Sequence, residues 1–289
     1  MPRIIALSGS RHQNQFLNGI PSLLKAFADR GFSLRFHSRF FGYLAENGIE
    51  MQPGWEAMDR PDADIEAVIS LGGDGTFLRT AQWLGGLPVP MLGINTGHLG
   101  FLTHYDLDDA GAIAEALYQH KFTAEQRSLL AVSGQGIPAH IWPYALNEVA
   151  ILKEDTSSMI TVHTELDGYF LADYLADGLI ISTPTGSTGY NLSVGGPIMQ
   201  PTIDCRVISP IAPHSLTMRP LVIGADSVVT ATTTSRAHTY RISLDGRSFV
   251  MTCGSQVKVS RAPFGVFTLR LESDNFPSVL RRKLHWAVR

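Results

Sequence analysis

The chain of 289 residues has few of the features that mark secreted, membrane or nucleic-acid-binding proteins. It contains only two cysteines, Cys205 and Cys253, without metal-ligand spacing, so we expect free thiols in a reducing, cytoplasmic environment. No segment approaches the roughly 18 apolar residues of a membrane span, and the apolar run at 4–7 is too short for a signal peptide. With a net charge of −3 and no long run of lysine or arginine, the sequence favours neither a membrane nor nucleic acid as a partner.

Two common nucleotide-binding motifs are also absent. No glycine is followed directly by lysine, which excludes the phosphate-binding loop called Walker A, and the pattern G-x-G-x-x-G does not occur. A phosphate donor must therefore be held by a loop of another kind.

The first 124 residues alternate short apolar runs with segments of helical period. The runs at 4–7, 65–71 and 89–94 predict buried strands, and the segments between and after them recur with helical spacing, as at 106–120. Alternating strands and helices are typical of a parallel sheet covered by helices. We therefore expect an α/β N-terminal domain over residues 1–124, with a Rossmann-like parallel sheet.

From residue 125 the sequence becomes rich in Thr, Ser, Val and Ile with alternating polarity. Asp-Gly pairs at 167–168 and 245–246 predict tight hairpin turns. These signals indicate a mainly antiparallel all-β C-terminal domain over residues 125–273. Residues 274–289 regain helical spacing, so we expect this last helix to return to the first domain, with the basic residues 281–283 in solvent at its end.

The first segment with a chemical meaning is GGDGT, residues 72–76, between a predicted strand and a predicted helix. Its glycines let backbone N–H groups approach a phosphate closely at the start of a helix. A carboxylate would repel that phosphate unless a cation or a substrate hydroxyl lies between them. Asp74 therefore fits a general base that accepts the proton of an attacking hydroxyl while Mg²⁺ neutralises the phosphates. The alternative is that the Asp74 carboxylate only caps the following helix.

A second segment places two adjacent polar residues, Asn147 and Glu148, inside the apolar run ALNEVAIL at 145–152. Because neighbouring strand residues point to opposite faces, at least one of them is expected to face inward, where an unpaired polar group costs about 1 to 3 kcal/mol. A ligand with vicinal hydroxyls, such as a ribose, would satisfy both side chains. The alternative is a polar strand end at the sheet surface.

The third segment, ADGLIISTPTGSTGYNLSVGGPI at 176–198, follows a buried strand with a long polar loop. Five hydroxyl residues and two glycines lie between Ser182 and Gly189, which suits recognition of a nucleotide, and Tyr190 is available to stack on a base. A serine hydrolase is disfavoured because the loop lacks the G-x-S-x-G pattern. At the second Asp-Gly turn, Arg247 is expected either to extend into solvent or to reach an anionic part of a ligand.

Together these segments resemble motifs of the NAD kinase family in its bacterial form. The matching segments follow in order and cover nearly the whole chain: GGDGTFL, GINTGHLGFLT, LNEVAI, DGLIISTPTGSTGYNLSVGGPI and PIAPHSLTMRPLVI. GGDGT is shared with diacylglycerol kinases, sphingosine kinases and phosphofructokinases, whereas LNE followed by DGLIISTPTGST is specific to NAD kinases. The resemblance implies transfer of the γ-phosphate of ATP to the 2′-hydroxyl of the adenosine ribose of NAD, which gives NADP, with Mg²⁺ as cofactor. It also implies the two-domain fold above and a homodimer or homotetramer.

The resemblance further implies roles for single residues, although it assigns no metal ligand. Asp74 would accept the proton, Asn147 and Glu148 would contact hydroxyls of NAD, Asp177 would contact the nicotinamide part, and 188–193 would contact the adenosine half. The full nucleotide-binding set is Gly72, Gly73, Asp74, Gly75, Thr76, Arg79, Asn147, Glu148, Ser158, Leu175, Asp177, Thr188, Gly189, Tyr190, Asn191, Leu192, Ser193 and Arg247.

Three positions of this set depart from the family pattern. Gly189 stands where alanine is usual, Arg247 where glutamine is common, and Leu175 near a position that is commonly polar or basic. These departures keep the transfer chemistry and leave the choice between NAD and NADH open.

Two other functions share parts of the sequence pattern. A lipid kinase would carry GGDGT, but the chain lacks the basic or amphipathic stretch that binds a membrane surface. A non-catalytic sensor of NAD or NADP would not need to keep Asp74, Asn147, Glu148 and Asp177 together.

Overall fold

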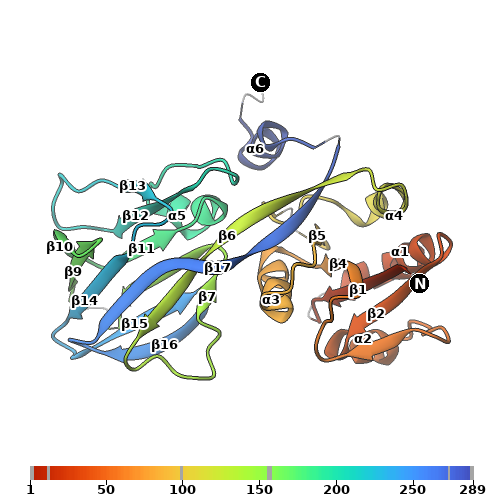
Figure 1. Ribbon diagram of the computed structural model, residues 1–289, viewed down its shortest axis with the longest axis horizontal. Coiled ribbons are helices and arrows are strands. Elements are labelled where there is room, and N and C mark those ends of the chain that lie inside the picture. The colour runs from red at the N-terminus through yellow and green to blue at the C-terminus, as the bar shows by residue number, and fades with distance from the viewer. Residues whose placement is uncertain (1–2, 12–13, 98–99, 155–157, 273, 287–289) are drawn as a thin grey trace. The chain divides into compact units, whose positions relative to one another are not determined.

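The chain folds into two units. The computed structural model describes residues 3–11, 14–97, 100–154, 158–272 and 274–286. Met1–Gln126 together with Val266–Arg289 forms unit 1, and Arg127–Gly265 forms unit 2. Two long strands, β6 (Phe122–Gly134) and β17 (Gln256–Leu271), each pass from one unit into the other (Figure 1). Since a strand keeps one alternating pattern along its length, the sequence does not mark this crossing, and the domain limits after residues 124 and 273 stay a prediction.

Unit 1 is built on a parallel sheet with the strand order β17-β5-β4-β1-β2-β3. Besides β17, its strands are β1 (Arg3–Gly9), β2 (Phe32–His37), β3 (Glu56–Met58), β4 (Ile65–Leu71) and β5 (Met91–Ile94). The central strands β1 and β4 are almost wholly buried, which explains their unbroken apolar runs.

Helices pack on this sheet with their apolar faces. They are α1 (Ile20–Ala28), α2 (Ser38–Glu46), α3 (Asp74–Leu84) and α4 (Ala110–Tyr118); unit 1 also contains α6 (Phe276–Leu284) and the short 3₁₀ helices η1 (Asn14–Gly19) and η2 (Leu107–Asp109). Leu23 and Phe27 of α1 share one buried core with Leu7 of β1 and Ile69 of β4. The last helix, α6, belongs to unit 1 as expected.

Unit 2 consists of two antiparallel sheets. One has the order β10-β9-β14-β17 and the other β13-β12-β11-β8-β15-β16, while β6 pairs with β17 and β7. The bounds are β7 (Tyr144–Ala145), β8 (Glu148–Lys153), β9 (Ile160–Leu166), β10 (Tyr169–Ala176), β11 (Gly178–Ser182), β12 (Cys205–Ile211), β13 (Leu221–Gly224), β14 (Val229–Thr234), β15 (Thr239–Leu244) and β16 (Arg247–Thr252). Both sheets contribute to one core, for example through Val162 of β9 and Ile242 of β15. The short helices η3 (Thr185–Thr188) and α5 (Tyr190–Ser193) follow β11.

Both Asp-Gly pairs form the predicted hairpin turns, between β9 and β10 and between β15 and β16. The φ angles are 52° and 83° at Asp167 and Gly168, and 48° and 81° at Asp245 and Gly246. Two successive positive φ angles are typical of a type I′ turn, whose twist matches the flanking strands. The predicted fold class, a parallel α/β part and an antiparallel β part, is confirmed. None of the described helices is both long and apolar enough to cross a membrane.

Candidate functional site

Asp74 is the first residue of α3, directly after the GG turn that follows β4. Gly73 caps the helix with extended backbone, and no side chain caps it. The Asp74 carboxylate instead accepts hydrogen bonds from the loop after β5. Oδ1 accepts from the N–H groups of Leu102 (3.0 Å) and Thr103 (3.1 Å) and from the Thr103 hydroxyl (3.0 Å), and Oδ2 accepts from the Phe101 N–H (2.8 Å). The helix-capping alternative is therefore wrong. Among the described residues Oδ2 accepts only one hydrogen bond, so the open acceptor position of the carboxylate is on this oxygen.

Gly100 allows this loop to pass close to the Asp74 carboxylate. A Cβ atom at Gly100 would lie 1.6 Å from Asp74 Oδ1 and 2.4 Å from Thr103 Oγ1. Only glycine fits such an approach. Sequence reasoning did not identify residues 100–103 as the partners of Asp74, and the glycine was the one local signal for the contact.

Arg79 of α3 places a cation next to the GGDGT loop. Gly72 has a φ of 150°, and a Cβ there would lie 2.4 Å from Thr76 Oγ1. The Thr76 hydroxyl is buried and accepts a hydrogen bond from Arg79 Nη2 at 3.0 Å. Gly75 and Arg79 are exposed. The loop therefore offers a glycine-rich backbone and one exposed guanidinium group, which suits an anionic ligand.

The loop that holds Asp74 is itself fixed by the end of β17. The Tyr105 hydroxyl donates to the Asp274 carboxylate and accepts from the Leu271 N–H at 2.9 Å. His104 Nε2 lies 3.5 Å from Asp274 Oδ2. Burial alone would raise the pKa of Asp274, but the neighbouring His104 ring and the hydrogen bond from Tyr105 outweigh burial and lower it. The start of α6 and the Asp74 loop are thus tied together within unit 1.

In unit 2, Asn147 and Glu148 present unsatisfied acceptors. Asn147 Oδ1 and Glu148 Oε2 are buried, and neither has a hydrogen-bond partner among the described residues. Burial, with help from the negative charge of Asp245, raises the pKa of Glu148 to about 7, although the Tyr190 backbone N–H opposes the rise. Buried acceptors without donors are rare in folded proteins, so this pair is suited to a ligand that carries hydroxyl groups.

Asp245 anchors the backbone beneath this pair. Its side chain is only 3% exposed. Its carboxylate accepts the backbone N–H groups of Leu146 (2.7 Å), Asn147 (2.9 Å) and Glu148 (3.1 Å). The sequence identified Asp245 only as a turn residue, because its partners lie 97 to 99 positions earlier in the chain.

Arg247 stabilises the segment that leads to Asn147 through hydrogen bonds to its backbone. Its guanidinium donates to the backbone carbonyls of Leu244 (3.0 Å), Trp142 (2.8 Å) and Tyr144 (2.5 Å). Its Cζ also lies 5.1 Å from the centre of the Trp142 ring. These contacts engage the guanidinium within the chain, so Arg247 does not extend into solvent.

The loop after β11 lies against Glu148. Gly189 has a φ of −91°, which any residue adopts, and a Cβ atom there would lie 3.1 Å from Glu148 Oε2. The Thr188 hydroxyl is directed to its own helix, where it donates to the Thr185 carbonyl at 3.4 Å. Tyr190 is 40% exposed. Glycine in place of alanine thus leaves additional space beside the unsatisfied Glu148 oxygen.

Asn191 holds this loop together from the inside. The side chain is fully buried, and its Nδ2 donates to the carbonyls of Ser187 (3.2 Å) and Pro197 (3.2 Å). Its Oδ1 accepts from the Ser209 hydroxyl at 2.6 Å. Its amide is therefore engaged within the protein. The next two residues, at 192–193, are half-buried and exposed.

Asp177 forms an ion pair within unit 2. Its Oδ1 lies 2.7 Å from Lys153 Nζ, and the Asp177 side chain is 34% exposed. One oxygen of the Asp177 carboxylate thus pairs with the Lys153 ammonium at the surface, and the carboxylate remains accessible to a ligand.

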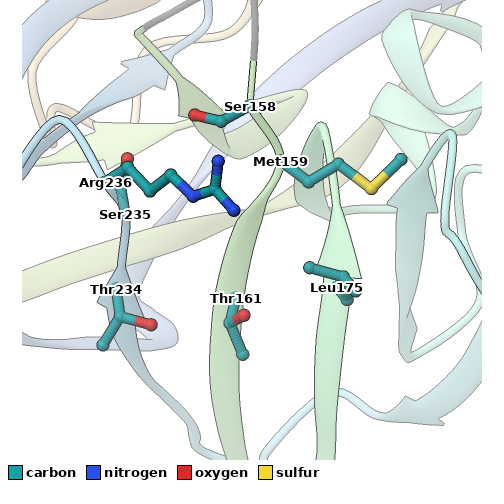
Figure 2. A pocket seen from close by; sticks show the side chains of 7 residues that line it. All are labelled: Ser158, Met159, Thr161, Leu175, Thr234, Ser235 and Arg236. Atoms are coloured by element: carbon teal, nitrogen blue, oxygen red, sulfur yellow. The ribbon is translucent and has the colours of Figure 1, made fainter.

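Ser158 and Leu175 line one pocket in unit 2, with a volume of about 590 Å³. The full lining is Ser158, Met159, Thr161, Leu175, Thr234, Ser235 and Arg236. Ser158 Oγ is buried and has no hydrogen-bond partner among the described residues. Figure 2 shows the Arg236 guanidinium extending toward the segment that leads from Ser158 into β9, which carries Thr161. Sequence reasoning missed Arg236, because no local motif surrounds it.

The predicted residues therefore form separate groups. Residues 72–79 meet 100–103 in unit 1, residues 147–148 meet 188–190 in unit 2, and Ser158 meets Leu175 at the pocket. Within the part of the chain that the structure describes, no three His, Cys, Asp or Glu side chains are placed to hold a metal ion.

Comparison with known protein families gives two matches along the chain. Residues 53–122 match the ATP-NAD kinase N-terminal domain, and residues 146–271 match the ATP-NAD kinase C-terminal domain.

Similar full-length proteins and structures carry related names. The chain is 42% identical over 285 residues to the NAD kinase of Porphyromonas gingivalis and 38% identical over 283 residues to that of Bacteroides fragilis, covering 98% of each chain. Its fold resembles the crystal structure of yeast NADH kinase complexed with NADH, with a TM-score of 0.86, 20% identity, and coverage of 100% of this chain and 89% of that one. It also resembles an NAD kinase from Archaeoglobus fulgidus in complex with ATP, with a TM-score of 0.71, 24% identity, and coverage of 98% and 97%.

Proposed function

The chain belongs to the ATP-NAD kinase family, and we propose that it transfers the γ-phosphate of ATP to the 2′-hydroxyl of the adenosine ribose of NAD with Asp74 as the proton acceptor. The single observation that carries the acceptor assignment is the pair of buried oxygens, Asn147 Oδ1 and Glu148 Oε2, that lack donors among the described residues. Hydroxyl groups of NAD other than the reacting 2′-hydroxyl would supply the missing donors.

In the proposed step, the 2′-oxygen of NAD forms a bond to the γ-phosphorus and the bond from that phosphorus to the β,γ-bridging oxygen breaks. ADP leaves with the bond's electron pair. The hydroxyl proton passes to Asp74 Oδ2, the carboxylate oxygen that has an open position beside the hydrogen bond from Phe101. The hydrogen bonds from residues 101–103 fix the carboxylate, which keeps this oxygen oriented.

The phosphates of the donor are assigned to the glycine-rich loop at 72–76 and to the Arg79 guanidinium. Mg²⁺ is held in proteins by one or two carboxylates together with substrate phosphates. The lack of a three-ligand cluster among the described residues fits a metal that arrives with the nucleotide. When bound, Mg²⁺ would neutralise the charge on the transferred and leaving phosphates, with Asp74 as the neighbouring carboxylate.

The remaining predicted residues form two groups: those that contact the ligand and those that stabilise the loops around it. Asp177, Tyr190 and the pocket of Ser158 and Leu175 keep accessible groups, and we assign them to the NAD molecule. Asn191 and Arg247 are engaged within the chain, so we assign them to holding the loops that carry the contacts.

The same family membership supports a cytoplasmic, homo-oligomeric enzyme. Tyr169 and Phe170, at the tip of the β9–β10 hairpin, are 80% and 62% exposed, and β10 is an edge strand. Large exposed aromatic side chains at a sheet edge are suited to an interface between copies of the chain.

The family matches do not favour a lipid kinase.

A coupled assay with purified protein tests the function. With ATP, Mg²⁺ and NAD, we expect NADP to form. A protein that phosphorylates diacylglycerol and not NAD would be a lipid kinase, and one that binds NAD without any turnover would be a sensor. Parallel reactions with polyphosphate as donor and NADH as acceptor define the substrate range.

Asp74→Asn tests the proton acceptor. We expect the turnover number to fall by about 10² to 10⁴-fold, because an amide does not accept the proton, while calorimetry shows unchanged NAD binding. Asp29→Asn is the matched control, since its side chain is 56% exposed and pairs with Lys25 in the same unit. A fully active Asp74→Asn variant would remove Asp74 from this role.

A further inference from the structure

The last turn of α6 carries three cations, and one of them faces the Asp74 loop. Arg281 and Arg282 are exposed, in keeping with the predicted solvated turn, whereas Lys283 is half-buried. Lys283 Nζ lies 5.6 Å from the centre of the Phe101 ring. Phe101 is the residue whose N–H donates to Asp74 Oδ2, the oxygen with the open acceptor position. The Lys283 ammonium therefore lies next to the loop that holds the Asp74 carboxylate, close enough to feel the charge of Asp74.

The charged groups around Lys283 include Asp74 of the candidate transfer site. Burial lowers the pKa of Lys283, while the negative charges of Asp74 and Asp106 oppose the effect and the positive charge of Arg282 adds to it. Within the part of the chain that the structure describes, Lys283 makes no ion pair. A partly buried ammonium without an ion-pair partner is costly unless a ligand supplies the anion.

Contacts at the start and in the middle of α6 hold the helix that carries this lysine. At the start, the Asn275 side chain accepts the Ser278 N–H at 3.0 Å, next to the contacts of Asp274 with the Asp74 loop. Further along, Val279 and Leu280 are buried, which orients the helix and turns Lys283 inward. Packing thus fixes the helix, and the contact with the Phe101 ring places the ammonium at its end.

A phosphoryl-transfer site with an aspartate needs positive charge to offset it. Phosphate-binding loops of the Walker type supply a lysine from within the loop, and GGDGT has none. Arg79 offers one cation from α3, hydrogen-bonded to Thr76. A second cation near Asp74 would reduce the repulsion between its carboxylate and the negatively charged phosphates of the donor.

We propose that Lys283 is a phosphate-binding residue that contacts the γ-phosphate of the donor nucleotide on the side of Asp74. This inference rests on the proposed function and adds to it a cation from the C-terminal helix. Lys283 is far along the sequence from every nucleotide-binding motif. It lies next to the Asp74 loop because α6 folds back into unit 1.

Three variants test the proposal: Lys283→Met, Lys283→Arg and the matched control Arg281→Met from the same turn. For Lys283→Met we expect kcat/KM for ATP to fall by about 10- to 100-fold, as for loss of a charge-assisted contact. Calorimetry should show weakened binding of ATP but unchanged binding of ADP, which lacks the γ-phosphate. Lys283→Arg should restore most of the activity, and Arg281→Met should match the parent protein.

Several outcomes would overturn the proposal. Unchanged kcat/KM for ATP in Lys283→Met is one. Equal weakening of ATP and ADP binding is another, since it would place the lysine away from the γ-phosphate. A third is a loss of NAD binding that tracks a lowered melting temperature, because a purely structural lysine would produce it. Failure of the parent protein to form NADP would instead contradict the proposed function itself.

Discussion

Asp74 in unit 1 and Asp245 in unit 2 each hold a loop in place through hydrogen bonds to its backbone. Each carboxylate accepts three backbone N–H groups from a loop that is distant in sequence, at 101–103 and at 146–148. Such charge-assisted hydrogen bonds are stronger than neutral ones and fix the loop geometry. In each case the organised loop carries, or faces, the groups assigned to the reaction.

At the residue scale, Gly100 is expected to be irreplaceable. In Gly100→Ala the new methyl group would overlap Asp74 Oδ1, so the carboxylate must move, and a shift of about 1 Å can lower turnover about 10²-fold. The measurement is kcat together with thermal unfolding followed by circular dichroism. Gly111→Ala in α4 is the control, since a Cβ there meets nothing within 4 Å, and it should stabilise the protein by about 0.5 to 1 kcal/mol. Full activity of Gly100→Ala would show that the Asp74 position is not critical.

A second residue-scale prediction concerns the pH dependence of NAD binding through Glu148. In the free protein its pKa is raised to about 7 from 4.5, so its contribution to stability is complete below about 4.5 and is lost as the pH rises through about 7. Ribose hydroxyls that donate to the carboxylate favour its charged form. NAD affinity should therefore rise between pH 6 and 8, by up to about tenfold per unit below the pKa.

Calorimetry in two buffers of different ionisation enthalpy measures this linkage, because NAD binding should release a proton near neutral pH. Glu148→Gln should bind more weakly and lose the pH dependence. A parent protein whose NAD affinity is flat over this range would contradict the assignment of ribose to Glu148.

At the element scale, the two hairpins with Asp-Gly turns offer a matched comparison. Asn tolerates the positive φ of both turns, so Asp245→Asn and Asp167→Asn should each keep the turn. Asp245→Asn turns an N–H donor toward the 146–148 loop, so we expect a loss of about 1 to 3 kcal/mol in the free energy of unfolding. NAD affinity should fall with it.

The control hairpin should respond less. Asp167 is at the surface, where its Oδ1 accepts the Val228 N–H at 2.7 Å, so Asp167→Asn should change stability by less than about 1 kcal/mol. Denaturant unfolding and NAD titration of both variants give the comparison. Equal effects at the two turns would mean that the carboxylate of Asp245 has no special role.

At the scale of the whole molecule, each unit has its own buried core. Leu7 belongs to the core of unit 1 and Ile242 to that of unit 2, and both are fully buried. Leu7→Ala and Ile242→Ala should each cost about 2 to 5 kcal/mol. Hydrogen exchange should show faster exchange chiefly in the unit that carries the substitution, and the double variant should be nearly additive. Faster exchange throughout both units in each single variant would indicate one cooperative core.

The sequence predicted the parts of the fold that depend on neighbouring residues. The apolar run at 65–71 is β4, the Asp-Gly pairs at 167–168 and 245–246 are hairpin turns, and the tail is a helix. These features follow from local backbone preference and from the period of burial, which a short segment carries by itself. The sequence likewise identified the segments that bear the chemistry.

What only the tertiary structure decided is which distant groups meet. Asp74 is 27 to 29 residues from its hydrogen-bond partners, Asp245 is nearly a hundred residues from the loop it anchors, and Lys283 reaches Phe101 through the return of α6. Arg247 points to three backbone carbonyls for the same reason. A side chain's type and spacing determine what it can bond to, whereas its partner is selected by the packing of elements that are far apart along the chain.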